Sequence, residues 1–179
     1  MGGTIDKDYP RLTSGYAFEF GDECAASRIM KSHPNLGVTF DVTSVCTKDS
    51  LDIEDNDREI LVNALKTRFQ KYGIGQKDQF SVFRVVVTHG TDTMIETALF
   101  VRSRLDEILP SSSGIVIAFT GATKPERFVD SDASFNLGCA VGATSICPPG
   151  SVVICINGNC IPCERCVRGE ESGLFELKS

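Results

Sequence analysis

The chain has 179 residues, of which 41% are hydrophobic and 23% are charged, ordinary values for one globular domain with a substantial core. Its formal net charge is −6, and no run of basic residues suggests a surface that follows a nucleic-acid backbone. No apolar stretch approaches the ~20 residues of a membrane-spanning helix, and the first residues show no signal-peptide pattern. We therefore expect a cytoplasmic protein that binds neither nucleic acid nor a membrane.

Hydrophobic periodicity predicts strands and helices that alternate along the chain. In chain order, the expected elements are a loop over 4–21, a helix over 22–31, a strand over 38–46, a loop over 48–53, a helix over 55–72, a strand over 81–87, a helix over 93–109, a strand over 114–120, a helix over 132–145 and a strand over 151–156. This alternation favours a doubly wound α/β fold, with a mostly parallel sheet and helices on both faces. We expect one domain over 1–168 and a poorly packed tail over 169–179.

One segment joins a predicted strand to a polar turn. Val85, Val86 and Val87 lead into a turn that contains Thr91 and Asp92, and a helical pattern follows at once. Ligands of open α/β sheets bind at the carboxyl ends of the strands. A hydroxyl can donate to a substrate carbonyl and a carboxylate can hold an ammonium group, so this turn suits an amino acid substrate.

Four segments match one family in order and spacing: residues 2–5 (GGTI), 88–94 (THGTDTM), 120–122 (TGA) and 132–137 (DASFNL). Together they resemble the bacterial-type L-asparaginases over nearly the whole chain, and the opening GGTIDK resembles the short, single-domain members that lack the C-terminal domain. The resemblance implies hydrolysis of the side-chain amide of L-asparagine to aspartate and ammonia, with no metal or cofactor. Because longer relatives complete their active site with a neighbouring subunit, it also implies a homo-oligomer, at least a dimer.

The resemblance assigns the nucleophile to Thr4, which would attack the amide carbon and form an acyl-enzyme. A threonine hydroxyl is a weak nucleophile unless a neighbouring group activates it. A tyrosine on a loop assists in the family; Tyr9 matches the short members, whereas Tyr16 stands where longer members carry theirs. Backbone N–H groups would form an oxyanion hole for the tetrahedral intermediate.

The remaining roles fall on two segments. The resemblance assigns Thr91 to the attacking water or the acyl centre, and Asp92 to the α-ammonium of the substrate. Ser50 matches a residue that contacts the α-carboxylate, and Asp49 is grouped with it as substrate-binding. Asp92 and Ser50 are also plausible helix caps. His89, inside the motif, is expected to be structural.

The lysine that partners the second threonine in the family has no obvious counterpart. Alignment with longer members puts Cys147 there, whereas short members take the lysine from nearer the C-terminus, where this chain has Arg168. Lys124 is a further candidate. Arginine keeps its charge and could stabilise an anion, but it cannot readily shuttle a proton. If no lysine reaches Thr91, we expect reduced turnover.

A second departure lies at the N-terminus. In the family a hydrophobic strand precedes the GGT motif within the sheet, whereas only Met1 precedes it here. Losing an inner strand would leave unpaired backbone groups and a gap. A misplaced start codon or a shortened chain would explain this. The alternatives are an inactive homologue that binds amino acids or a partner, and another segment or subunit in the slot. A glutaminase or amide-transfer relative is a third hypothesis.

Eight cysteines are many for this length, and Cys155, Cys160, Cys163 and Cys166 fall within twelve residues. Such spacing could ligate zinc or an iron–sulfur cluster. Against this, Cys155 lies in a predicted strand, and the family that the chain resembles binds no metal. We therefore favour free thiols.

Overall fold

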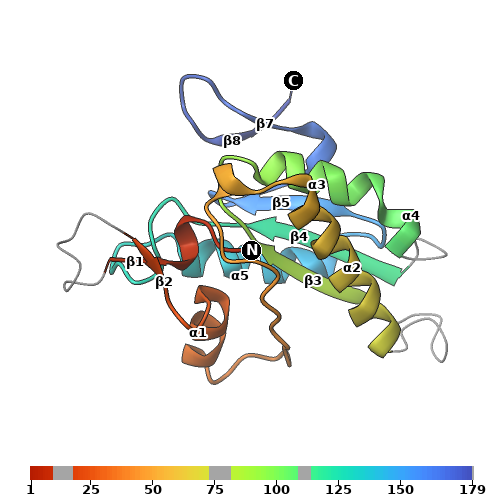
Figure 1. The fold of residues 1–179 in the computed structure, drawn as a ribbon, viewed down its shortest axis with the longest axis horizontal. Helices are drawn as coiled ribbons and strands as arrows, with labels where there is room; N and C mark the ends of the chain where they lie inside the picture. Colours follow the sequence, from red (N-terminus) through yellow and green to blue (C-terminus); the bar gives the residue numbers. More distant parts are fainter. Residues whose placement is uncertain (10–17, 73–81, 109–113, 179) are drawn as a thin grey trace.

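The computed structural model describes residues 1–9, 18–72, 82–108 and 114–178. Figure 1 shows its helices and strands. The 3-10 helices are η1 (Thr4–Asp6), η3 (Ser50–Asp52) and η5 (Cys163–Arg165), and the α-helices are α1 (Ala25–Ser32), α2 (Asp55–Tyr72), α3 (Met94–Ser103), α4 (Leu105–Ile108) and α5 (Ala133–Ile146). The strands are β1 (Lys7–Asp8), β2 (Glu19–Phe20), β3 (Phe83–Thr88), β4 (Ile115–Thr120), β5 (Val152–Ile156), β6 (Asn159–Pro162), β7 (Cys166–Arg168) and β8 (Phe175–Leu177).

The central sheet has the order β3-β4-β5-β6. Strands β3, β4 and β5 are parallel, while β6 returns antiparallel to β5 after a short turn. Every residue of β4 is buried, because β4 has a strand on each side and helices on both faces. Its apolar sequence, IVIAFT, has the continuous pattern of a strand buried on both faces. The predicted α/β fold is confirmed.

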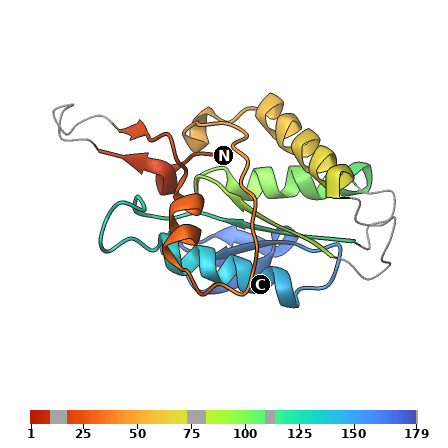
Figure 2. The same ribbon diagram turned by 90° about the horizontal axis from the view of Figure 1, so that it is seen from below.

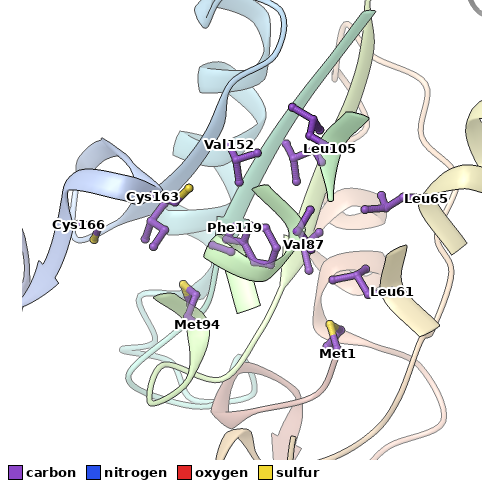
Figure 3. Close-up of a cluster of buried hydrophobic side chains, with 14 of the residues drawn as sticks. Met1, Leu61, Leu65, Val87, Met94, Leu105, Phe119, Val152, Cys163 and Cys166 are labelled. Carbon is purple, nitrogen blue, oxygen red and sulfur yellow. The ribbon is translucent and has the colours of Figure 1, made fainter. Parts of the chain in front are cut away.

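Helices cover both faces of the sheet, as predicted. Figure 2 shows α2 and α3 on one face and α1 and α5 on the other. The larger core cluster lies on the α2 and α3 side, and its members include Leu61, Val87 and Phe119 (Figure 3). On the other side, Ala140 and Ala143 of α5 pack against the sheet, and these small side chains let the helix approach it closely.

Most predicted elements are present. Helix α2 spans the predicted residues, and α5, β4 and β5 begin or end within one residue of the prediction. The helix predicted over 93–109 is broken at Arg104 into α3 and α4. Both Leu105 and Ile108 of α4 are buried. Among the described residues, no helix is long and apolar enough to cross a membrane.

The strand predicted over 38–46 is wrong. This segment has no strand structure, and Val38, Phe40 and Val42 are 39–45% exposed. A cleft of about 1220 Å³ lies between it and β3, lined by both segments and by α1, α2 and α5. Strand propensity is expressed only when a neighbouring strand is there to pair with. Within the described residues, β4 is the only strand bonded to β3, and residues 38–46 have no such neighbour.

The first three residues cross one end of this cleft. The Met1 ammonium donates a hydrogen bond to the Thr88 carbonyl at the end of β3, at 2.8 Å. The Gly3 amide donates to the Lys48 carbonyl at 2.9 Å, and Gly2 forms a parallel bridge with Lys48. Residues 1–3 therefore lie between the end of β3 and Lys48. Away from this end, the cleft lies between β3 and residues 38–46, where no strand is paired with β3 in the described residues.

The segment after residue 168, for which we expected a poorly packed tail, contains strand β8. Strands β7 and β8 form an antiparallel pair, and Phe175 is only 2% exposed. Phe175 belongs to the same core cluster as Cys163 and Cys166. Burial of the Phe175 ring stabilises the packing of this segment against the core, because aromatic side chains remove a large apolar area from water. The proposed division into one domain and a tail otherwise stays a prediction.

Candidate active site

Three loops meet at the carboxyl end of β3. A Cβ atom on Gly3 would lie 2.3 Å from the Gly90 Cα atom, and one on Gly90 would lie 2.4 Å from the Ser50 Cβ atom. The two glycines thus let the backbones approach more closely than side chains would allow, and Gly3 has a φ of 82° that favours glycine. The residues that follow them, Thr4 and Thr91, are both half-buried. The structure therefore brings the predicted nucleophile loop, the Thr91–Asp92 turn and Ser50 together.

The Asp92 carboxylate accepts hydrogen bonds from two side chains of the site. One carboxylate oxygen accepts a hydrogen bond from the Ser50 hydroxyl at 2.9 Å, and the other accepts one from the Arg168 guanidinium at 3.1 Å. The Thr93 hydroxyl donates to the Ser50 carbonyl at 2.6 Å, which fixes η3 against the start of α3. The Asp92 side chain is 47% exposed, so solvent and a ligand can reach it.

Asp49 points toward a different partner. Its carboxylate forms an ion pair with the Lys7 ammonium, and the Lys7 hydrogen bond is the main reason that the Asp49 pKa is lowered. A weaker hydrogen bond from the Leu51 amide places Asp49 as the N-cap of η3. Asp49 therefore links β1 to η3 and holds Ser50 in place. Sequence reasoning had not identified Lys7 as its partner.

Tyr9 lies just beyond β1 and is 39% exposed. Its ring is 6.1 Å from that of Phe128, centroid to centroid, in a tilted arrangement. The other candidate tyrosine, Tyr16, lies outside the described residues.

The three candidates for the lysine position lie in different places. Arg168 reaches the site from β7 and contacts Asp92. The Lys124 ammonium pairs with Asp130 on an exposed loop. Cys147 caps the far end of α5, and its sulfur lies 3.9 Å from that of Cys160. Of the three, the structure brings Arg168 into the cluster with Asp92 and Ser50.

His89 is fully buried at the end of β3. Its Nδ1 atom lies 2.8 Å from the Gly90 carbonyl, and its Nε2 atom has no partner among the described residues. Burial lowers the pKa of His89 to about 4, so the ring is neutral at pH 7. A neutral ring wedged beside Phe119, with centroids 6.4 Å apart, fits the structural role we expected.

Two buried polar residues that support the site were not singled out from the sequence. Asn136 of α5 donates to the Gly121 carbonyl at 3.0 Å and accepts from the Asn157 amide at 3.0 Å, so it ties the ends of β4 and β5 together. Asp6 accepts a hydrogen bond from the Ala25 amide at the start of α1. The signal for Asn136 was its place in the DASFNL segment, whereas nothing local indicated the contact of Asp6.

The clustered cysteines split between the two sides of the sheet. Cys155 packs under α5, whereas Cys163 and Cys166 belong to the core on the α3 side. In the part of the chain that the structure describes, no group of three or more His, Cys, Asp and Glu side chains could hold a metal ion. Cys155, Cys163 and Cys166 are close in the sequence, but they do not come together at one position in the structure.

The sequence profile of the family described as asparaginase, N-terminal, matches residues 1–178. The chain belongs to the asparaginase family. A comparison with curated proteins found no match. Similar solved structures include L-asparaginase I from Vibrio cholerae, with 19% identity, a TM-score of 0.73 and coverage of 98% of this chain and 48% of that chain.

The thermostable L-asparaginase from Thermococcus kodakarensis has 20% identity and a TM-score of 0.73, covering 99% of this chain and 49% of that one. A probable cytoplasmic L-asparaginase from Campylobacter jejuni has 19% identity and a TM-score of 0.70, covering 100% and 55%. This asparaginase-family chain therefore spans about half the length of these relatives. At this level of identity the likeness supports the shared fold.

Proposed function

We propose that this asparaginase-family domain hydrolyses the side-chain amide of L-asparagine to L-aspartate and ammonia, with Thr4 as the nucleophile. The observation that carries the proposal is the backbone contact between Gly3 and Gly90, with Ser50 packed against Gly90. This contact brings the residue before Thr4 against the residue before Thr91, which supports a shared site for the two threonines and Asp92. Nucleophilic catalysis needs such groups within reach of one substrate.

In the proposed reaction, the Thr4 oxygen attacks the amide carbon, ammonia leaves, and an aspartyl ester remains on Thr4. A water molecule positioned by Thr91 then attacks the ester and releases aspartate. Tyr9, five residues after the nucleophile, is the group we propose to help remove the Thr4 proton. Asp92 would bind the substrate ammonium, with Ser50 next to it for the substrate carboxylate.

Arg168 gives this site a feature of its own. Its guanidinium already occupies one oxygen of Asp92, at 3.1 Å, so a substrate ammonium must share or displace that contact. The pair is exposed, with side chains 41% and 47% accessible, and exposed pairs contribute only about 0–1 kcal/mol. Displacement is therefore inexpensive, and the freed guanidinium would remain next to the substrate carboxylate.

The test is ammonia release from asparagine and from glutamine, measured for the wild type, for Thr4→Ala and for Thr67→Ala. Thr67 lies on the exposed surface of α2, and its hydroxyl donates to the Asn63 carbonyl of the same helix, so its variant is a matched control. We expect Thr4→Ala to lose more than about a thousandfold in rate, since removing a nucleophile has effects of that size or larger. Equal rates for wild type and Thr4→Ala would reject Thr4 as nucleophile.

One observation favours a second candidate, a homologue that binds amino acids with impaired turnover: the charged group that reaches Asp92 is an arginine, which cannot readily shuttle a proton. Calorimetry with aspartate would show binding without turnover in this case. Measurable asparagine hydrolysis would exclude it. A higher rate with glutamine would favour the glutaminase alternative.

We also propose a homo-oligomer, at least a dimer, by analogy with the longer relatives, and a cytoplasmic location. Light scattering at micromolar concentration tests the first of these proposals, and a monomer would count against it.

A further inference from the structure

Cys147, Cys155 and Cys160 gather beneath and beside α5, near a fourth cysteine, Cys139, within that helix. Cys147 is the C-cap of α5, Cys155 lies in β5, and Cys160 lies opposite Cys155 in the register of β6. The sulfur atoms of Cys147 and Cys160 are 3.9 Å apart, although thirteen residues separate them in the sequence. Neither the spacing of the cysteines nor the proposed reaction accounts for this pair.

The three thiols differ in their access to solvent. Cys160 is exposed, Cys147 is half-buried and Cys155 is fully buried, and all are free thiols in this structure. A disulfide needs a sulfur–sulfur distance of about 2.05 Å, so the Cys147 and Cys160 sulfurs must approach by roughly 2 Å. Side-chain rotation can supply such a movement where one partner is exposed. The exposed thiol is also the one that a small oxidant reaches first.

We propose that Cys147 and Cys160 form a reversible disulfide, with Cys160 as the point of entry for a low-molecular-weight disulfide such as glutathione disulfide. The Cys160 thiolate attacks one sulfur of the small disulfide, whose S–S bond breaks and releases one thiolate. The Cys147 thiolate then attacks the Cys160 sulfur, and the second small thiolate leaves. The two protein thiols lose two electrons and two protons, and the small disulfide gains them as two thiols.

Burial decides the order of these two steps. It raises the pKa of Cys147 to about 11, with the neighbouring Cys160 thiol adding to the effect. Because the thiolate is the nucleophile, Cys147 is poorly suited to the first attack, which is intermolecular. Its attack on the Cys160 mixed disulfide is intramolecular, between sulfurs that start 3.9 Å apart, so Cys147 serves as the resolving thiol. Cys155 does not compete well, since burial raises its pKa further and covers its sulfur.

The bond would join the end of α5 to β6. Strand β6 leads through η5 to β7, whose Arg168 contacts Asp92. The disulfide would therefore hold in place the strand from which the chain continues to Arg168. Closing a loop of this size restricts the unfolded chain, and the oxidised protein should melt several degrees above the reduced protein.

The test uses the full chain, first reduced and then incubated with excess glutathione disulfide. Remaining thiols are alkylated, and the peptides are mapped by mass spectrometry without reduction. We expect a peptide pair cross-linked through Cys147 and Cys160, which disappears on treatment with dithiothreitol. The thermal midpoint should fall by the same several degrees on reduction.

Variants make the outcome decisive. Cys147→Ser should stop at a mixed disulfide between glutathione and Cys160, and Cys160→Ser should give neither product. Cys24→Ser, at the N-cap of α1, should behave as the wild type. A wild-type protein that accumulates only the mixed disulfide, or that links Cys160 to Cys155 instead, would overturn the proposal, as would a Cys147 cross-link that survives in Cys160→Ser.

Discussion

Two segments with similar, strand-favouring sequences lie on opposite sides of β3 and have different structures. On one side, β4 is fully buried and pairs with β3 along its whole length. On the other side lies a cleft of about 1220 Å³, and the β-branched segment over 38–46 stays outside any strand. Both segments are rich in residues that favour strands. The difference teaches that pairing and burial, rather than composition, decide which of them becomes a strand.

The largest expected contrast is in stability. Phe119, fully buried in β4, contacts the core on the closed side, whereas Phe40 is 43% exposed beside the cleft. Phe119→Ala should lower the free energy of unfolding by about 3–5 kcal/mol, since it leaves a cavity in a packed core. Phe40→Ala should cost less than about 1 kcal/mol. Urea unfolding of both variants checks this, and equal losses would show that the open side is packed as firmly as the closed one.

A pH-dependent effect should come from His89, at the end of β3 on the closed side. Its pKa is lowered from 6.5 to about 4 by burial, so between these values the unfolded chain binds more protons than the folded one. The stability that His89 contributes is therefore complete above pH 6.5, is lost as the pH falls toward 4, and amounts to roughly 3 kcal/mol.

The measurement for His89 is the urea midpoint of wild type and His89→Gln at pH 7 and pH 5. The loss between the two pH values should be smaller in His89→Gln. His33→Gln, at an exposed position after α1, should keep the wild-type loss. If His89→Gln keeps the full loss as well, the burial of a neutral histidine is not its cause.

Substitution of Gly3, at the end of the cleft, should have a larger effect than substitution of Gly37, on the open side. A Cβ on Gly3 would meet Gly90 backbone atoms at 2.3 Å, whereas one on Gly37, on the open side, would meet nothing within 4 Å. Gly3→Ala should destabilise the protein by about 1–3 kcal/mol and lower asparagine turnover by about a hundredfold, because it displaces Thr4. Gly37→Ala should be close to neutral. Thermal unfolding and ammonia release test this prediction. Equal effects of the two substitutions would show that the contact between Gly3 and Gly90 is not tight.

The smallest predicted effect concerns Arg168, the candidate for the family lysine position that contacts Asp92. Arg168→Lys should raise kcat by about tenfold, since lysine can transfer a proton and arginine cannot. Arg165→Lys, an exposed change three residues earlier, should leave kcat unchanged. Steady-state kinetics with asparagine test both. A fall in kcat for Arg168→Lys would mean that the fixed guanidinium is needed as it stands.

Local sequence patterns were sufficient for α2, β4 and α5, because their apolar periodicity and their neighbours agree. They were insufficient for residues 38–46, where the pattern was that of a strand but no partner strand is present among the described residues. The burial of Phe175 also depends on contacts distant in sequence, so the fold of β7 and β8 was missed.

The candidate site shows the same limit. Ser50, Thr91 and Asp92 were found from their motifs, and the structure brings them together. The contact of Arg168 with Asp92 joins residues 76 positions apart, and that of Cys147 with Cys160 crosses from a helix to a strand. Spacing along the chain carries no information on such pairs, since they depend on how the elements pack.

The central claim is that Thr4 forms an aspartyl ester with the substrate. The most direct measurement mixes the protein with L-asparagine, stops the reaction in acid, and maps the peptides by mass spectrometry. The account predicts one aspartyl group on the peptide that contains Thr4, and none in Thr4→Ala. An aspartyl group on another residue, or full turnover by Thr4→Ala, would contradict it.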